Sequence, residues 1–366
     1  MKIIFIAVKG IPIGGGIEKY TEEIGSRLVE RGHEVIIYCS RHYGTKSCDY
    51  RGMRLIALPC LNSRSLQKLS LALMASLHQL SLRKVDIAHY HAIGPSVFCF
   101  MSRLIGRKTV VQSHGHEWMR AKWGRAGKIF FKLTEYAAMY FPHGVTAVSK
   151  ELKSYYENRY HRNVTYIPTG ITPTEKVLPD NIKKYGLEGN DYILFAARHV
   201  AEKGAHYLID AYQKINTDKK LVIAGDAQHE EKYKALLRVK ANNNPNILFP
   251  GFVQGDLLAE LFSNAYIYVL PSEIEGLPIS LLEAMSYGSC CVVSDIPENQ
   301  EALGDCGYLF KNKDVDDLQR CLKELLDNEE LTESKKVQAK NRVEADFTWD
   351  LVTDEFESFY NKLIRD

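Results

Sequence analysis

The sequence predicts an α/β protein made of two Rossmann-like domains, each a doubly wound parallel sheet, that face each other across a cleft. Short runs rich in Ile and Val alternate with amphipathic stretches of helical length along the chain. This alternation is typical of parallel sheets covered by helices on both faces. The length of 366 residues also favours two domains, because one hydrophobic core rarely grows that large. Such sheets bind ligands beyond the carboxyl ends of their strands, so we expect a ligand site in the cleft.

The predicted elements follow one pattern that starts at the amino terminus and restarts in the second half. In the first half they are a helix at 17–31 and strands at 2–8, 33–39, 108–113 and 143–148. In the second half they are a helix near 203–214 and strands at 191–197, 220–225, 246–251 and 265–271.

A domain boundary is predicted near residues 168–190, where three prolines gather and hydrophobic periodicity is weak. We therefore expect an N-terminal domain at 1–170 and a C-terminal domain at 171–346. Residues 347–366 carry apolar and aromatic side chains three or four positions apart, which predicts a final helix.

Composition favours a cytoplasmic protein. Hydrophobic residues make up 45% and charged residues 25% of the chain, as in ordinary globular proteins. The first apolar run ends before Lys9, too short for a signal peptide, and no stretch approaches the roughly 18 apolar residues that span a bilayer. The eight cysteines show no metal-ligand spacing and are interpreted as reduced thiols.

Charge is distributed unevenly along the chain. Residues 1–170 contain 25 Lys and Arg against 11 Asp and Glu, a net +14, whereas the remainder has 22 against 34, a net −12. A basic half without nucleic-acid motifs indicates contact with anionic lipid or a phosphorylated acceptor. The alternative is that the two halves attract each other.

A glycine-rich loop follows the first strand. Gly14, Gly15 and Gly16 open a helix near Ile17, where exposed amides would hold a phosphate or another anion. The dinucleotide pattern G-x-G-x-x-G is absent, which argues against a dehydrogenase. The alternative is a tight turn without a ligand.

A polar cluster follows strand 108–113. His114 and Glu117 are expected at the carboxyl end of that strand, facing the cleft, although a lone histidine is often structural. Basic and indole side chains then crowd into eleven residues, which suits a phosphate-bearing lipid at a membrane surface. They are Trp118, Arg120, Lys122, Trp123, Arg125 and Lys128.

Two cations follow the first strand of the second half. Arg198 and Lys203 lie at the predicted strand end and helix start, where together they would grip a diphosphate. Arginine offers a planar fork of donors and lysine a mobile point charge, so the pair suits a leaving pyrophosphate. The alternative is a pair of surface charges.

The most specific motif lies at residues 271–288. Gly276, Leu277 and Pro278 open a helix whose first amides would meet a phosphate or a sugar hydroxyl. Glu275 precedes this helix, and Glu283 lies inside it among apolar residues. A buried carboxylate needs hydrogen-bond partners, which ribose hydroxyls would supply. The alternative is an ion pair at a helix start.

These motifs resemble the retaining GT-B glycosyltransferases, known as glycosyl transferases group 1 or family four, over nearly the whole chain. Two departures are Pro168-Thr169-Gly170, where the family usually has Pro-Asn-Gly, and Gly225-Asp226-Ala227, where Gly-x-Gly is common. The matching residues are Glu275 and Glu283 of the Glu-x7-Glu motif, Gly15, Gly16 and Glu18 of the Gly-Gly-x-Glu loop, Arg198, Lys203, His114, and the final helix near Trp349.

The resemblance implies a role for each of these residues. Glu283 would hold the ribose, and Arg198 and Lys203 the diphosphate. Glu275 and the amides near Leu277 and Ile279 would contact the donor sugar, with Glu275 and His114 as catalytic candidates. Phe252 and Val253 would lie by the base. The final helix would cross back to the first domain. Glu18, Glu117, Trp118, Arg120, Lys122 and Arg125 would lie on the acceptor or membrane side.

The implied activity is transfer of a sugar from a UDP- or GDP-sugar to a glycan or polyprenyl-diphosphate-linked acceptor in cell-surface polysaccharide assembly. The N-terminal domain would serve the acceptor and the C-terminal domain the nucleotide-sugar. No cofactor and no metal would be needed, since cations replace it; the pair Asp314 and Asp316 is interpreted as helix capping. We expect the protein to be peripheral on the inner face of the plasma membrane. The alternatives are a nucleotide-sugar epimerase and a non-catalytic membrane-docking scaffold.

Overall fold

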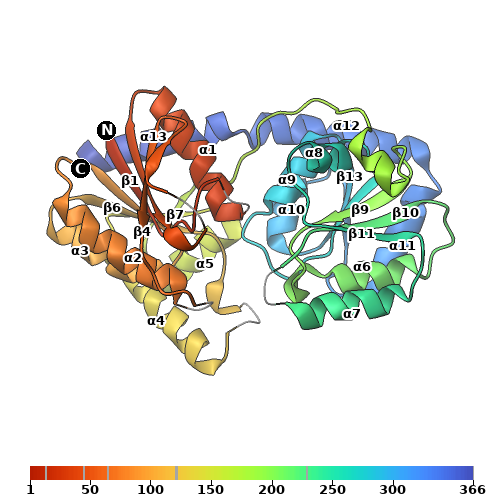
Figure 1. Ribbon diagram of the computed structural model, residues 1–366, viewed down its shortest axis with the longest axis horizontal. Helices are drawn as coiled ribbons and strands as arrows, with labels where there is room; N and C mark the ends of the chain where they lie inside the picture. The colour runs from red at the N-terminus through yellow and green to blue at the C-terminus, as the bar shows by residue number, and fades with distance from the viewer. Residues whose placement is uncertain (13–14, 44–45, 64–65, 120–122, 228–229, 366) are drawn as a thin grey trace. The chain divides into compact units, whose positions relative to one another are not determined.

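The computed structural model describes residues 1–366 except 13–14, 44–45, 64–65, 120–122, 228–229 and 366 (Figure 1). The chain divides into two compact units, Met1–Gly170 with Trp349–Asp366 (unit 1) and Ile171–Thr348 (unit 2). Arg120 and Lys122 of the predicted site therefore lie outside the described residues. Among the described residues, none of the helices combines the length and apolar character needed to cross a bilayer.

Unit 1 contains, within the part of the chain that the structure describes, an eight-stranded sheet in the order β3-β4-β2-β1-β5-β6-β7-β8. Every neighbouring pair is parallel except β3 with β4. Its strands are β1 (Lys2–Ile6), β2 (Glu34–Ser40), β3 (Cys48–Tyr50), β4 (Met53–Leu58), β5 (Ile87–His91), β6 (Lys108–Ser113), β7 (Gly144–Ala147) and β8 (Thr165–Tyr166).

Helices cover both faces of this sheet (Figure 1). One face carries α1 (Gly16–Glu30) and α13 (Trp349–Arg365), and the other carries α2 (Gln67–His78), α3 (Cys99–Leu104) and α4 (Arg125–Tyr140). Helix α5 (Lys150–Tyr160) connects β7 to β8.

Helix α13 belongs to unit 1 although the whole of unit 2 precedes it in the chain. Its buried side chains Trp349, Val352, Phe356 and Tyr360 recur at helical spacing along one face. Ion pairs join its exposed side to α1, including Arg27 with Asp350 at 2.9 Å.

Unit 2 contains, among its described residues, a six-stranded sheet in the order β11-β10-β9-β12-β13-β14, parallel throughout. Its strands are β9 (Tyr192–Ala196), β10 (Lys220–Ala224), β11 (Ile247–Gly251), β12 (Ile267–Leu270), β13 (Cys290–Ser294) and β14 (Tyr308–Phe310). Its helices are α6 (Ala205–Tyr212), α7 (Glu231–Ala241), α8 (Gly255–Ser263), α9 (Ile279–Ser286), α10 (Pro297–Leu303), α11 (Val315–Leu326) and α12 (Glu329–Asp346).

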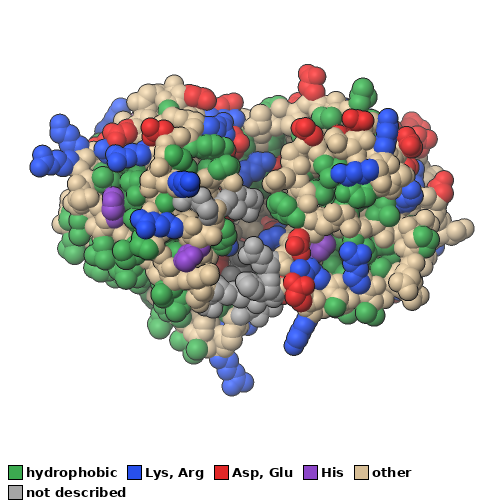
Figure 2. All heavy atoms as spheres, viewed as in Figure 1, with side chains coloured by type: hydrophobic (Ala, Val, Ile, Leu, Met, Phe, Trp, Pro, Cys, Tyr) green, Lys and Arg blue, Asp and Glu red, His purple; other side chains and the backbone are tan. Residues whose placement is uncertain are grey.

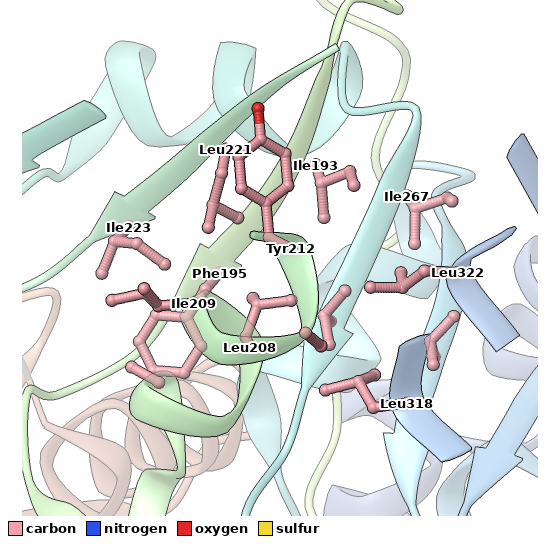
Figure 3. Close-up of a cluster of buried hydrophobic side chains, with 14 of the residues drawn as sticks. Ile193, Phe195, Leu208, Ile209, Tyr212, Leu221, Ile223, Ile267, Leu318 and Leu322 are labelled. Atoms are coloured by element: carbon pink, nitrogen blue, oxygen red, sulfur yellow. The ribbon is translucent and has the colours of Figure 1, made fainter. Parts of the chain in front are cut away.

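One hydrophobic cluster of unit 2 lies between a face of the sheet and α6, α7 and α11 (Figure 3). Leu208, Ile209 and Tyr212 form the apolar face of α6 and pack with strand residues such as Ile193. Burying one such aliphatic side chain stabilises the fold by about 1.5–3 kcal/mol, so this face fixes α6 on the sheet. The start of α6 and the loop before it are thereby held at the carboxyl ends of the strands.

The predicted fold class, two parallel-sheet Rossmann-like units, is confirmed. The strand predicted at 2–8 ends earlier, at Ile6, because Ala7 adopts a positive φ of 75° that extended pairing does not permit. Strands β3, β4, β5, β8, β13 and β14 were not predicted. Strand β5 is rich in histidine, with His89 and His91, and therefore lacks the Ile and Val run that identified the other strands.

Candidate active site

Each sheet reverses its strand order at one point. In unit 2 the chain runs from β9 outward to β10 and β11, then returns to place β12 on the other side of β9. Ile193 and Leu194 of β9 pair there with Ile267 and Tyr268 of β12. Ligands of open α/β sheets bind beyond the carboxyl ends of the strands at such a switch point. The loops after β9 and β12 are therefore the candidate site of unit 2.

Lys203 and Glu275 form an ion pair between those two loops. Lys203 ends a 3-10 turn after β9, and Glu275 lies between β12 and α9. Lys203 Nζ is 2.5 Å from Glu275 Oε1, and the two side chains are only 14% and 9% exposed. Water screens such a buried pair weakly, so the contact is a strong charge-assisted hydrogen bond.

Arg198, the second predicted cation, lies on the surface at the carboxyl end of β9. Its side chain is 57% exposed and approaches Glu202 at 3.8 Å. A loose surface contact of this kind contributes little to stability. The Arg198 guanidinium therefore lies at the switch point with most of its side chain in solvent.

Gly204 lets the loop that carries Lys203 approach the end of β12. Its φ is +71°, and a Cβ at this position would lie 1.9 Å from the carbonyl oxygen of Pro271. No side chain fits there, because the obstacle is backbone. Gly225 has the same role after β10, where a Cβ would lie 1.9 Å from the Ala197 carbonyl oxygen. The conformation of both loops thus depends on glycine.

Helix α9 places Glu283 on its more accessible side. Its neighbours Leu281, Leu282, Ala284 and Met285 are buried, whereas Ile279, Ser280, Glu283 and Tyr287 form a half-buried stripe. The sequence analysis treated Glu283 as a buried carboxylate; the structure leaves it half-buried, because helical periodicity turns this position away from the apolar face. Pro278 is the N-cap of α9 rather than part of its first turn.

The other predicted donor residues precede α9 or follow β11. Gly276 is half-buried and Leu277 is buried, just before α9. Phe252 is 62% exposed and Val253 is buried. Both follow β11, which β10 separates from β9.

Two buried residues of this edge were missed by the sequence analysis. Burial raises the pKa of the Tyr268 hydroxyl well above its usual value, and the charges of Glu275 and Glu283 add to the rise. Burial lowers the pKa of His199, whose Nε2 has no hydrogen-bond partner among the described residues. His199 adjoins Arg198 in sequence, so its position carried a signal; Tyr268 looked like an ordinary strand residue.

The switch point of unit 1 lies between β1 and β5. The loop after β1 contains Gly15, the N-cap of α1, and Gly16, its first residue. Glu18 is buried and accepts a hydrogen bond from the Lys9 amide at 3.2 Å. A Cβ on Gly15 would lie 2.3 Å from Oε2 of Glu18. The Glu18 carboxylate therefore lies against the backbone of this loop.

His114 follows β6 and belongs to a buried chain of hydrogen bonds. Thr21 Oγ1 donates to the Ile17 carbonyl at 2.8 Å, so it accepts from Nε2 of His91 at 3.1 Å. Burial lowers the pKa of His91 well below its usual value, which keeps that ring neutral. Nδ1 of His91 must then accept from Nε2–H of His114 at 3.0 Å. It follows that a neutral His114 carries its lone pair on Nδ1.

The segment after His114 packs against α4. Glu117 is half-buried in a 3-10 turn (Glu117–Met119), and Arg125 is exposed as the first residue of α4. The Lys132 ammonium lies 4.7 Å from the ring centroid of Trp118, and Trp123 packs on Phe131 with centroids 4.8 Å apart. Both indoles thus contact side chains of α4.

Asp314 caps α11, as the sequence analysis interpreted it. Its side chain accepts hydrogen bonds from the amides of Asp316 and Asp317. Among the described residues, no three His, Cys, Asp or Glu side chains are grouped to hold a metal ion.

The fold and these strand-end residues define a class of protein: a two-unit α/β enzyme with charged groups at the switch points of its sheets. Two family models match most of the chain: Glycosyltransferase Family 4 at residues 14–175 and Glycosyl transferases group 1 at 179–342. The chain belongs to this family of GT-B glycosyltransferases.

The similarity to several known proteins covers nearly the full length of the chain. N-acetyl-alpha-D-glucosaminyl L-malate synthase of Bacillus anthracis is 24% identical, over 99% of this chain and 97% of that protein. Sucrose-phosphate synthase of Thermosynechococcus elongatus has a TM-score of 0.88 at 18% identity, covering 100% of this chain and 99% of its own. HepE of Anabaena, solved with UDP and glucose, has a TM-score of 0.83 at 17% identity, covering 99% and 100%.

Proposed function

We propose that this glycosyltransferase moves a sugar from a nucleoside diphosphate sugar, UDP- or GDP-linked, with retention of anomeric configuration. The observation that carries the proposal is the buried Lys203–Glu275 ion pair between the loops after β9 and β12. It provides a fixed cation and a fixed carboxylate at the point of the sheet where ligands bind. The related fold of HepE, solved with UDP-glucose, supports the donor class.

In this proposal Lys203 and Arg198 contact the diphosphate and Glu283 the ribose. The first amides of α9, which begins at Ile279, lack intrahelical partners and would contact the donor sugar or its phosphate. Gly15 and Gly16 at the start of α1 would supply amides in the same way. Phe252 and Val253 would lie by the base.

The chemistry follows from preorganised charge. As the bond between the sugar and the diphosphate breaks, Lys203 and Arg198 stabilise the negative charge that develops on the leaving oxygen. The acceptor hydroxyl attacks from the same face and passes its proton to a donor phosphate oxygen. Glu275 orients Lys203 and contacts the sugar. Its carboxylate is ion-paired and therefore a poor nucleophile, so the proposal gives it no covalent role. No metal and no cofactor enters the reaction in this proposal.

The proposed acceptor is a glycan or a polyprenyl-diphosphate-linked sugar of cell-surface polysaccharide assembly. A lipid-linked acceptor requires the enzyme to work at a membrane, and we propose peripheral association with the anionic inner surface of the plasma membrane. The net charge of +14 in residues 1–170 supports this. Glu117 and Arg125 of unit 1 would serve the acceptor side, and His114 is a catalytic candidate.

The testing experiment is thermal unfolding with UDP, GDP, dTDP and NAD, on the wild type and Glu283→Ala. A ligand at about 100 times its Kd stabilises by roughly 2.7 kcal/mol, which shifts the midpoint measurably. We expect one nucleoside diphosphate to raise the midpoint and Glu283→Ala to abolish the rise. Glu344→Ala is the control, since this half-exposed α12 carboxylate lies outside the proposed site. Stabilisation by NAD alone would contradict the proposal.

A further inference from the structure

Most of the exposed large hydrophobic side chains of unit 1 belong to one layer of helices. Figure 2 shows hydrophobic side chains gathered over the lower left of the molecule, where Figure 1 shows α2, α3 and α4. We call this surface the α2–α3–α4 face. It consists of Leu66, Leu73, Leu77, Leu80, Phe100, Leu104, Ile105, Ile129, Phe130, Leu133, Tyr136, Tyr140 and Phe141.

The apolar residues of α4 form a continuous outward stripe. Ile129, Leu133, Tyr136 and Tyr140 are 60%, 65%, 52% and 52% exposed and recur at intervals of four, three and four. The opposite side of α4 is buried in unit 1, with Phe131, Ala138 and Met139 beside Thr134 and Glu135. An ordinary surface helix has one apolar side, so the outer stripe is not explained by the core.

The stripe of α4 continues onto α2 and α3. On α2 and the turn after it, Leu73, Leu77 and Leu80 have the same spacing and are exposed. The rings of Phe100 in α3 and Phe141 after α4 lie 6.1 Å apart, so the two helices present one joined surface. Exposed apolar surface of this extent is rare on monomeric proteins unless it binds something.

The charges of this face have one sign. Arg103, Arg125 and Lys128 are exposed on α3 and α4. Helices α2 and α3 contain no acidic residue, and the acid of α4, Glu135, is buried and accepts a hydrogen bond from Tyr160. An apolar surface with basic side chains around it matches the interfacial layer of an anionic bilayer, where hydrocarbon lies below phosphate.

We infer that the α2–α3–α4 face docks on an anionic lipid bilayer, with the outer stripe of α4 inserted at the level of the acyl chains. The inference deepens the proposed membrane association by naming the surface and the mode of binding. Basic side chains would contact lipid phosphates while Ile129 and Leu133 leave water. Electrostatic attraction alone would bind the protein without insertion, so apolar substitutions distinguish the two modes.

The experiment is co-sedimentation with vesicles of equal parts phosphatidylcholine and phosphatidylglycerol, and with phosphatidylcholine alone. We expect the wild type to bind the anionic vesicles. The double variant Ile129→Asp and Leu133→Asp should weaken binding by at least about a hundredfold, since each side chain loses roughly tenfold in transfer. Arg125→Glu with Lys128→Glu should weaken binding to anionic vesicles by about tenfold or more.

Val239→Asp is the matched control, because Val239 is 75% exposed on α7 of unit 2. It should bind vesicles as the wild type does. All variants alter exposed side chains, and the thermal shift with the donor nucleotide checks their folding. Failure of vesicle binding with an intact nucleotide shift would overturn this inference and leave the donor proposal standing.

Two other results would also overturn the inference. One is unchanged vesicle binding by Ile129→Asp with Leu133→Asp. The other is a wild-type dimer in sedimentation velocity that the same substitutions dissociate, which would assign the face to a second copy of the chain.

Discussion

The ammonium of Lys203 lies 2.5 Å from a carboxylate oxygen of Glu275, and both side chains are almost entirely buried. The pair joins the loop after β9 to the loop after β12. These strands are neighbours in the sheet but more than 70 residues apart in the chain. In the proposed mechanism the contact has two roles that can be separated: it fixes the loops, and it holds a cation for the donor.

We predict that Lys203→Ala destabilises unit 2 and abolishes donor binding. The substitution leaves Glu275 buried without its cation, which costs about 1–3 kcal/mol of unfolding free energy. The double variant Lys203→Ala with Glu275→Ala removes that unpaired charge and should recover part of the stability, but not the donor-induced thermal shift. Urea unfolding and calorimetric titration with the nucleotide measure the two roles. A full thermal shift in Lys203→Ala would show that Lys203 does not bind the donor.

We predict that Gly204→Ala destabilises unit 2 by more than about 2 kcal/mol, because it combines a positive φ with a backbone clash. Gly288→Ala is the matched control. Its φ of +73° is nearly that of Gly204, at +71°, but a Cβ on Gly288 meets nothing within 4 Å. The difference in urea midpoint between the two variants therefore measures the clash with the Pro271 carbonyl. Equal midpoints would mean that the loop can move away from β12.

Residues next to hydrophobic strands could be predicted from the sequence, whereas pairings between distant segments could not. Lys203 was placed at a strand end because an apolar run identifies β9, and Glu275 was placed just before a helix because Gly276, Leu277 and Pro278 mark its start. Their contact depends on strand order, which periodicity does not reveal. The sequence analysis instead expected Lys203 to act with its neighbour Arg198, which the structure leaves on the surface.

The histidines of β5 show a second limit of prediction from the sequence. A strand whose polar side chains are buried by partners from other elements does not look hydrophobic. His89 meets Tyr360 from the far end of the chain at 2.6 Å, and His91 meets Thr21 of α1. Glu283 shows a third limit, since its apolar neighbours predicted burial, whereas its position on the helix leaves it half-buried.

We predict that unfolding free energy falls steeply as pH drops below about 6. Burial lowers the pKa of His89 to about 3, against an ordinary value of 6.5. The unfolded chain therefore binds a proton below pH 6.5 that the folded chain does not, and stability is lost as pH falls from 6.5 toward 3. Each such histidine contributes a slope of about 1.4 kcal/mol per pH unit.

His89→Gln should flatten this slope, because the amide does not titrate and can still bond Tyr360. Urea midpoints at about pH 5 and pH 7 measure the effect. His161→Gln is the control, since His161 is exposed at the end of α5. An equal slope in His89→Gln and the wild type would contradict burial of a neutral ring.

We predict that sugar transfer survives an excess of chelator. The proposed mechanism assigns the charge of the leaving diphosphate to Lys203 and Arg198, and Asp314 is engaged in capping α11. Transfer measured with and without EDTA, each then supplemented with magnesium or manganese, tests this. A complete loss of transfer that added metal restores would mean that a metal ion, and not Lys203 and Arg198, neutralises the leaving diphosphate.

We predict that Thr21 and His91 set the tautomer of His114. Thr21 donates to the Ile17 carbonyl, so it can only accept from His91, and this order passes along the chain to Nε2–H of His114. Selective ¹⁵N labelling of histidine reports the tautomer directly through the two ring-nitrogen shifts. The wild type should show His114 protonated at Nε2 at neutral pH.

Thr21→Val removes the acceptor for His91. The tautomer preference of His114 should then weaken, because reversing the direction of the His91–His114 hydrogen bond no longer breaks the bond to Thr21. Such a bond is worth about 1 kcal/mol, or roughly fivefold in population. Thr21→Ser restores the hydroxyl and should restore the wild-type spectrum. If His114 keeps its tautomer in Thr21→Val, the orientation of this ring is set elsewhere, and Thr21 and His91 are ordinary core residues.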